Sequence, residues 1–332
     1  HPALPPHAEL IRVLFYTFPA KNGRGFLNFL KNKSEKQKGR KISMSIRTDL
    51  AVEAVEFAGE QMPEGVVRSE EERNGVKITR VEVVDETAAQ QVGKPIGKYV
   101  TVSVSSFERA AQNYEDEITA IAEEIEAMLP KEGLVLVVGL GNNDITPDAL
   151  GPKTIDHTLA TRHISSEMAK SIGLEGLRSA AAIAPGVLGQ TGIETAEIIL
   201  SLTDKTKPAA VVVIDALASK SIDRLGTTVQ ISNTGIAPGA GVQNKRKEVN
   251  QHTLGMPVIA IGVPTVVDMS TIAHELSGEG QNPLLSAKGE TMMVTPREID
   301  VIIEKSARTL SLAINKALQP SLSIEDITAL VS

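Results

Sequence analysis

Residues 134–152, LVLVVGLGNNDITPDALGP, restrict the fold more than any other part of the chain. The run from Leu134 to Val138 is apolar, short and rich in β-branched residues, which predicts a buried strand. Gly139 and Gly141 favour a tight turn after it, because glycine adopts backbone angles that other residues avoid. The turn presents the polar residues Asn142, Asn143, Asp144, Thr146 and Asp148. Polar groups at the carboxyl end of a buried strand occupy the usual binding position of an open α/β sheet. We therefore expect a site here, with a capped glycine turn as the alternative.

A second apolar run, Pro208–Ile214, predicts another buried strand, and it leads directly into Asp215. If the two strands are neighbours, Asp148 and Asp215 face each other across the edge of the sheet. Two carboxyl groups in a partly desolvated cleft differ in proton affinity, so one can act as an acid and the other as a base. The alternative is that Asp215 caps a helix that begins at Ala216.

Two glycine-rich segments extend the candidate site. APGVLGQTGIET contains Gly186 and Gly189, and its main-chain amides either shape a tight connection or hold a substrate carbonyl or carboxylate. SNTGIAPGAGVQNKR ends in the basic pair Lys245 and Arg246. A loop of this length in a compact domain is usually functional or disordered.

Strands and helices alternate along the rest of the chain. Val76–Val84 and Tyr99–Val104 alternate apolar and polar residues, as half-buried strands do. A third apolar strand, Pro257–Val263, leads towards Asp268, which we expect to be a cap or a supporting carboxylate. The last long helix is expected over Arg297–Leu318. Buried strands interleaved with helices predict a three-layer α/β domain.

Composition divides the chain at residue 44. Residues 1–44 contain nine Lys and Arg against Glu9 and Glu35, so they carry +7. Because the whole chain carries −7, the remainder carries −14. We therefore expect residues 1–44 to be a basic extension or pro-segment that is disordered or removed, and residues 45–332 to form a single α/β domain. The alternative for the extension is a basic arm that binds an acidic partner.

Composition also disfavours several kinds of function. The chain has no cysteine, which excludes disulfides and thiolate chemistry. No apolar run is long enough to span a bilayer, and the negative net charge argues against direct nucleic-acid binding. His157 and His163 lie six residues apart, whereas two ligands on one helical face need a spacing of about three or four. We predict no metal or other cofactor and leave a weak or transient metal open.

Seven segments of the chain together resemble one protein family. They are IRTDLAVEA at 46–54, VVGLGNNDITPDALGP at 137–152, APGVLGQTGIET at 184–195, VVVIDALAS at 211–219, NTGIAPGAGVQNKR at 233–246, VIAIGVPTVVD at 258–268 and VTPREIDVIIEK at 294–305. The chain resembles the germination proteases of spore-forming bacteria, in which matching segments occur in the same order. The resemblance implies a hydrogenase-maturation-protease-like or phosphorylase-hydrolase-like fold: a twisted, mixed, largely parallel sheet between helices, in a single peptidase domain.

The resemblance also implies an activity. Germination proteases are endopeptidases that begin the degradation of small acid-soluble spore proteins during germination, cutting after an acidic residue and before an apolar one followed by Ala. They are made as inactive homotetrameric zymogens in the cytoplasm of the forespore and lose a short N-terminal segment. By resemblance, we expect the extension to be removed near Ser45 and Ile46.

The same resemblance assigns roles to particular residues. Two aspartates are essential in the family, and they match Asp148 in TPDALG and Asp215 in VIDALAS. One of them, ionised, would take a proton from the attacking water, and the other, protonated, would donate a proton to the carbonyl oxygen or to the leaving amide. Further candidates are Asn142, Asn143, Gly186 and Gly189 for the oxyanion or the substrate backbone, and Lys245 and Arg246 for the acidic residue of the substrate.

Two other classes of function stay open from the sequence. A hydrogenase-maturation-type metallopeptidase would require metal ligands and a nickel enzyme as substrate. A non-catalytic protein would use the glycine loops to hold a peptide or a phosphate group. The two aspartates at matching motif positions favour the protease.

Overall fold

The computed structural model describes residues 48–58, 62–105, 107, 113–171, 173–237, 247–269, 271–272 and 292–331. These residues lie in one compact unit, residues 46–332. The basic extension 1–44, the expected processing point at Ser45 and Ile46, and the pair Lys245 and Arg246 lie outside the described residues. The domain division at residue 44 and the roles of those residues therefore stay predictions.

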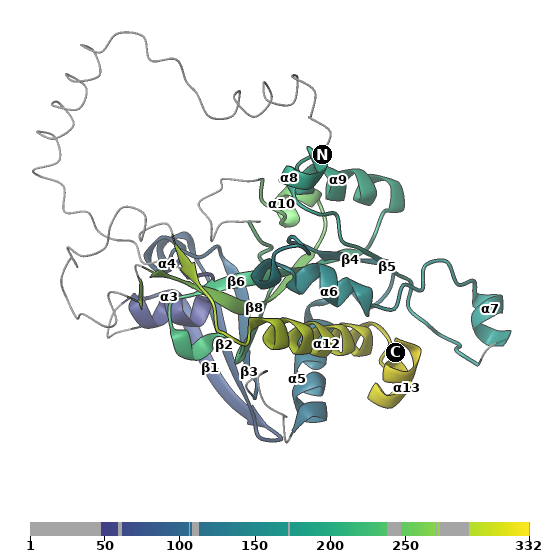
Figure 1. Ribbon diagram of the computed structural model, residues 1–332, viewed down its shortest axis with the longest axis horizontal. Helices are drawn as coiled ribbons and strands as arrows, with labels where there is room; N and C mark the ends of the chain where they lie inside the picture. Colours follow the sequence, from purple (N-terminus) through teal and green to yellow (C-terminus); the bar gives the residue numbers. More distant parts are fainter. Residues whose placement is uncertain are drawn as a thin grey trace, which may run out of the picture. The chain divides into compact units, whose positions relative to one another are not determined.

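A mixed β-sheet forms the middle layer of this unit (Figure 1). Its order is β1 (Val66–Arg73), β2 (Val76–Val83), β3 (Gly97–Ser103), β7 (Thr228–Ser232), β8 (Val258–Asp268), β6 (Ala210–Ser219), β4 (Val135–Gly139) and β5 (Ala180–Ile183), with the short β9 (Met293–Val294) paired to β8. Strands β8, β6, β4 and β5 are parallel to one another. Strands β1, β2, β3 and β7 are antiparallel to their neighbours in this order, and β7 also pairs with β8 in the antiparallel direction. The predicted α/β fold with a mixed sheet is confirmed.

Helices cover both faces of the sheet. One face packs against α5 (Tyr114–Met128), α6 (Leu150–Asp156), α12 (Ile299–Leu318) and α13 (Ile324–Leu330), and α6 lies beside α12 there (Figure 1). The other face packs against α9 (Thr195–Thr206) and α10 (Gln251–Leu254) over the parallel strands, and against α3 (Ala51–Phe57) and α4 (Glu86–Val92) over the antiparallel ones. Among the described residues, the shorter elements are α7 (Ser166–Ser171), α8 (Leu188–Thr191) and the 3-10 helices η1 (Thr146–Asp148) and η2 (Ile222–Arg224). The three predicted layers are therefore present.

Strand β4 explains why the continuous apolar run from Leu134 to Val138 predicts a buried strand. All of its residues are buried. Val135 and Val137 pack into the core that contains α5 and α12, whereas Leu136 and Val138 pack into the core on the opposite face. Because both faces of a parallel strand are covered, its residues are apolar throughout and do not alternate with polar ones.

Two strands are longer than their apolar runs predict. The sequence places their ends at Ile214 and Val263, but β6 continues beyond Asp215 and β8 continues to Asp268. The extensions pair with each other in parallel, with Ala216 opposite Val263. Asp215 therefore lies within a strand, and the alternative in which it caps a helix starting at Ala216 is wrong.

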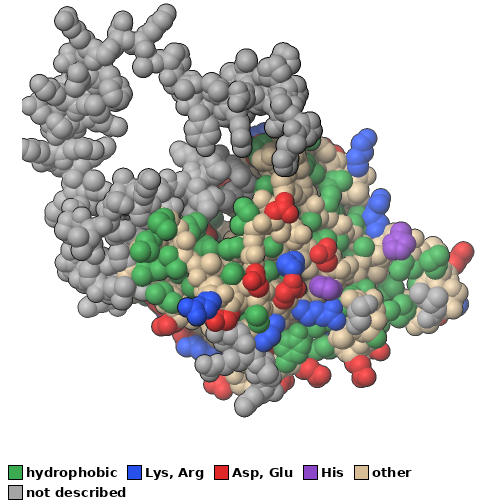
Figure 2. Space-filling model, viewed as in Figure 1, with side chains coloured by type: hydrophobic (Ala, Val, Ile, Leu, Met, Phe, Trp, Pro, Cys, Tyr) green, Lys and Arg blue, Asp and Glu red, His purple; other side chains and the backbone are tan. Residues whose placement is uncertain are grey.

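Charges of both signs are interspersed on the face that carries α6 and α12 (Figure 2). Lys153 on α6 forms an ion pair with Glu304 on α12, for example. No helix in the described ranges is both long enough and apolar enough to cross a membrane.

Candidate active site

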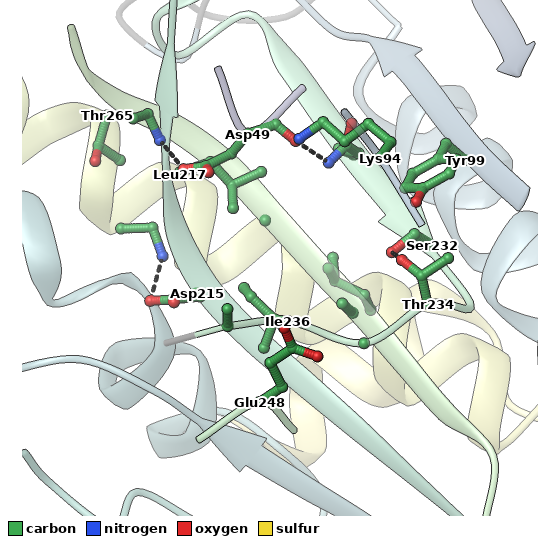
Figure 3. A pocket seen from close by; sticks show the side chains of 18 of the residues that line it. Asp49, Lys94, Tyr99, Asp215, Leu217, Ser232, Thr234, Ile236, Glu248 and Thr265 are labelled. Atoms are coloured by element: carbon green, nitrogen blue, oxygen red, sulfur yellow. Dashed lines mark hydrogen bonds between the residues drawn. The ribbon is translucent and has the colours of Figure 1, made fainter. Parts of the chain in front are cut away.

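A cavity of about 580 Å³ opens beside the carboxyl-terminal halves of β6 and β8 (Figure 3). Its wall combines residues that are far apart in the sequence, among them Asp49, Lys94, Tyr99, Asp148, Asp215, Glu248 and Thr265. The carboxyl ends of parallel strands are the usual binding position of an open α/β sheet. Both predicted catalytic aspartates thus line one cavity, which we define as the candidate active site.

Asp148 is positioned by the turn that follows β4. Gly139 at the end of β4 lies opposite Ile214 of β6, so the turn begins beside the strand that carries the second aspartate. The main-chain N–H of Asn142 donates to Oδ2 of Asp148 over 2.8 Å. Gly141 has φ +114°, and a Cβ built there would lie 1.9 Å from the carbonyl oxygen of Asp148. Glycine is therefore required at position 141 for the turn to bring Asp148 to this place.

Asp215 projects from within β6, where it is 8% exposed. Its Oδ1 accepts the N–H of Ala216 over 2.9 Å. On the β8 side Asp215 lies opposite Gly262, where an added Cβ would come within 2.7 Å of the Asp215 carbonyl oxygen. Close strand packing therefore restrains the main chain of Asp215, and the Ala216 amide restrains its carboxylate.

Thr265 of β8 braces the 3-10 helix that carries Asp148. Its side chain is 1% exposed, and Oγ1 donates to the carbonyl oxygen of Pro147 over 2.9 Å. The carbonyl oxygen of Thr265 in turn accepts the hydroxyl of Thr295 over 2.8 Å. Sequence reasoning passed over Thr265, because an isolated threonine in an apolar strand carries no local signal.

Asp49 and Lys94 form a second polar cluster in the wall of the cavity (Figure 3). The N–H of Asp49 donates to the carbonyl oxygen of Ala218 over 2.9 Å, and the N–H of Ala218 donates back to Asp49 Oδ2 over 2.8 Å. Lys94 Nζ donates to the carbonyl oxygens of Thr48 and Asp49 over 3.0 and 2.9 Å. Burial lowers the pKa of the Lys94 ammonium, and the nearby carboxylates of Asp49 and Glu53 oppose that shift. Asp49 falls in a segment that carried the family resemblance, but nothing in the sequence indicated Lys94.

The glycine-rich segment after β5 reaches the turn that holds Asp148. Gln190 of α8 donates from Nε2 to Asn142 Oδ1 over 2.8 Å and to Asp144 Oδ2 over 3.0 Å. Gly186 has φ +75° just before α8, as a left-handed turn requires. The segment therefore touches the site through Gln190, which sequence reasoning did not single out.

The other predicted residues that the structure describes do not form the wall of the cavity. The described residues that form its wall do not include Asn142, Asn143, Gly186, Gly189 or Asp268. Asn143 is exposed on the turn, and Asp268 is half-buried at the end of β8. Their roles in oxyanion binding and carboxylate support stay predictions.

The donor set was also tested for a metal site. Within the part of the chain that the structure describes, no group of three or more His, Cys, Asp or Glu side chains is arranged to hold a metal ion.

Sequence comparison places the chain among known proteins. Residues 47–277 match the family model described as germination protease. The chain belongs to the germination protease family. The germination protease of Caldanaerobacter subterraneus is 43% identical over 322 residues, which cover 87% of this chain and 99% of the relative. That of Clostridium perfringens is 43% identical over 85% of this chain and 98% of the relative, and that of Bacillus cereus is 38% identical over 82% and 94%. Membership confirms the resemblance and makes the chain a protease.

The solved structures include one distant likeness. The NiFe hydrogenase maturation protease HycI from Thermococcus kodakarensis is similar over 57% of this chain and 98% of its own, with 15% identity and a TM-score of 0.30. A likeness this low carries no argument about function.

Proposed function

We propose that this germination protease begins the degradation of small acid-soluble spore proteins and that Asp148 and Asp215 form its catalytic pair. The positions of the two aspartates in the fold support this catalytic pair. Two aspartates that are separated in the sequence follow or lie within neighbouring parallel strands and line the same cavity. Family membership supports the substrate class, since the relatives are named for a role in germination.

Peptide hydrolysis requires a base that activates water and an acid that protonates the leaving nitrogen. In our proposal one carboxylate, ionised, takes a proton from the water as its oxygen attacks the scissile carbonyl carbon. The other carboxyl group, protonated, donates its proton to the amide nitrogen as the C–N bond breaks. The Asn142 and Ala216 amides each hold one carboxylate in place. Such restraint favours catalysis because little reorganisation is needed during the reaction.

The cavity offers both an apolar and a basic element to a substrate that is cut between an acidic and an apolar residue. Ile145, Leu217 and Ile236 line it, and Lys94 contributes a buried ammonium group. We propose that the apolar side chain of the substrate residue that follows the cut packs on Ile145, Leu217 and Ile236. Lys245 and Arg246 stay our candidates for the acidic residue. Reversing both charges without a change in turnover or site preference contradicts this assignment.

The remaining family features are also proposals for this chain. They are a homotetrameric zymogen, location in the forespore cytoplasm, and removal of the basic extension near Ser45 and Ile46. Sequencing the amino terminus of the active protein tests the last of these. A start well beyond Asp49 contradicts it.

The deciding experiment is cleavage of a purified small acid-soluble spore protein by the processed parent and by Asp148→Asn and Asp215→Asn. Each substitution keeps the side-chain volume but removes the titrating group, so we expect turnover to fall by about 100- to 10,000-fold. Asp156→Asn, at an exposed aspartate at the end of α6, is the matched control and keeps full activity. Folding of every variant is checked by circular dichroism.

Each outcome separates one part of the proposal from another. Cleavage that survives either substitution at the pair rejects the catalytic assignment and leaves the family intact. A folded parent that does not cut the spore protein rejects the substrate class. Activity that disappears on addition of a chelator supports the metallopeptidase alternative.

A further inference from the structure

Two loops that are distant in the sequence meet at the turn that holds Asp148. The first is the turn after β4, from Asn142 to Asp144. The second is α8, which follows β5 and contains Gln190. The side-chain amide of Gln190 donates to Asn142 Oδ1 over 2.8 Å and to Asp144 Oδ2 over 3.0 Å. One amide group therefore bridges the two loops.

Asn142 transmits this bridge to the catalytic candidate. Its Oδ1 also accepts the N–H of Asp144 over 3.0 Å, which closes the turn on itself. Its own N–H donates to Asp148 Oδ2 over 2.8 Å. The Gln190 side chain thus fixes the residue whose main chain orients the Asp148 carboxylate.

Gln190 is itself held in place at the start of its helix. Its Oε1 accepts the N–H of Val187 over 3.4 Å, so the oxygen points back to α8 and the nitrogen points to the other loop. Thr195 at the start of α9 donates to the carbonyl oxygen of Gly186 over 3.4 Å, which ties the loop to a longer helix. An ordered side chain loses less entropy when it makes its bonds, so this arrangement favours the bridge.

We propose that Gln190 is a positioning residue for Asp148, acting through Asn142. The inference rests on the proposed function, in which Asp148 is catalytic. The bridge needs a side chain that donates two hydrogen bonds to oxygen acceptors while its own oxygen faces an amide. A glutamine side chain supplies the two donor N–H groups and the acceptor oxygen. A glutamate of the same shape places its carboxylate against the carboxylate of Asp144.

The bridge has a signature in the pH dependence of the reaction. A hydrogen bond donated to a carboxylate favours its ionised form, so weakening that bond makes protonation easier. The limb of the pH profile that Asp148 governs then moves to higher pH, whether Asp148 acts as base or acid. The other charged groups of the described site, Asp49, Lys94, Asp144, Asp215 and Glu248, keep their side chains in Gln190→Ala, but Asp144 also loses the hydrogen bond from Gln190. Because Asp144 is exposed and does not form the cavity wall, we assign the shifted limb to Asp148.

The experiment compares the parent with Gln190→Ala and Gln190→Glu in steady-state cleavage of the spore protein across pH. We expect kcat to fall by about tenfold, KM to change less than about twofold, and one pH limb to move upward. Adding Asp144→Asn to Gln190→Glu restores a donor and acceptor pair across the loops and recovers about half of the lost kcat. Gln91→Ala, at an exposed glutamine on α4, is the matched control and behaves as the parent.

Hydrogen exchange of the Asn142 amide gives a second measurement that does not depend on activity. In Gln190→Ala this amide exchanges at least about tenfold faster than in the parent. Unchanged kcat and pH limbs in Gln190→Ala overturn the positioning role, and so does a lower kcat with unchanged limbs and unchanged exchange. If the parent does not cut the spore protein, the proposed function fails separately. The hydrogen-exchange rate of the Asn142 amide then tests the Gln190 bridge by itself. An unchanged rate in Gln190→Ala overturns the positioning role.

Discussion

Replacing Glu53 by alanine tests how the first described helix is tied to the strand that carries Asp215. Glu53 lies on α3 and is 1% exposed. Its carboxylate accepts the N–H groups of Lys220 and Ser221, just beyond β6, over 2.7 and 3.0 Å. It also accepts the hydroxyl of Thr48 and lies 3.4 Å from Arg224 Nε. The buried Glu53 carboxylate therefore accepts three hydrogen bonds and forms an ion pair with Arg224.

The expected loss of stability follows from the two main-chain donors. A buried amide left without an acceptor costs about 1–3 kcal/mol. The Lys220 amide is buried and the Ser221 amide is half-buried, so losing the acceptor of both costs about 3 kcal/mol. Thr48 and Arg224 are only partly buried. Water can replace their partner, and they add little. We therefore expect Glu53→Ala to lower the free energy of unfolding by about 3 kcal/mol.

Urea denaturation at fixed protein concentration measures this loss. With an m-value of about 3 kcal/mol/M, the midpoint falls by about 1 M. Glu53→Gln keeps one acceptor oxygen and lowers the free energy of unfolding by about half as much. Glu56→Ala is the matched control on the same helix, because Glu56 is exposed and pairs with Arg68 and Arg224 at the surface. Its loss is at most about 0.5 kcal/mol.

The comparison between the two glutamates decides the reasoning. If Glu53→Ala and Glu56→Ala shift the midpoint equally, the buried amides do not depend on the carboxylate and the account is refuted. A change in m-value would point instead to a different unfolded ensemble.

Three further predictions concern residues in the cavity wall or close to it. Burial raises the pKa of Tyr99 to about 12, so the unfolded chain, with a tyrosine pKa of about 10, loses this proton first and stability falls as pH rises from about 10 to 12. Tyr99→Phe removes about 2 kcal/mol of that alkaline loss, measured as the difference between urea unfolding at pH 7 and at pH about 11.5. Gly141→Ala pushes a Cβ against the Asp148 carbonyl, so protease activity falls by about 100-fold or more in an assay of the folded protein. Thr265→Val loses the hydrogen bond to Pro147 and lowers the free energy of unfolding by about 1–2 kcal/mol.

Each of these predictions has a clear contrary result. If Tyr99→Phe loses as much stability at alkaline pH as the parent does, burial does not raise the pKa of Tyr99. Full activity in Gly141→Ala would show that the turn shifts without moving Asp148. A Thr265→Val variant as stable as the parent would show that the Pro147 carbonyl finds another donor.

The strands that were read correctly from the sequence are those whose burial shows in the local pattern. β4 is covered on both faces, so its run of apolar residues identifies it without knowledge of its neighbours. β1 was missed because it reads VVRSEEER and is mostly exposed, and it exists through pairing with β2. β5 is only four residues long and lies at the edge of the sheet beside β4. β5 pairs with a strand that is distant in the sequence, and such pairing leaves no periodic signal in either strand.

The sequence by itself determined the family and the α/β class, because motif residues and buried runs are local properties, and it named Asp148 and Asp215 as the proposed catalytic pair. The tertiary structure alone decided that β6 continues through Asp215, since the extension is stabilised by its pairing with β8. It also placed Lys94 and Thr265 in the cavity wall and Gln190 against Asn142. Each of these side chains acts through a bond to a main-chain or side-chain group from a distant segment. Such bonds follow from strand order and register, which no single stretch of the chain contains.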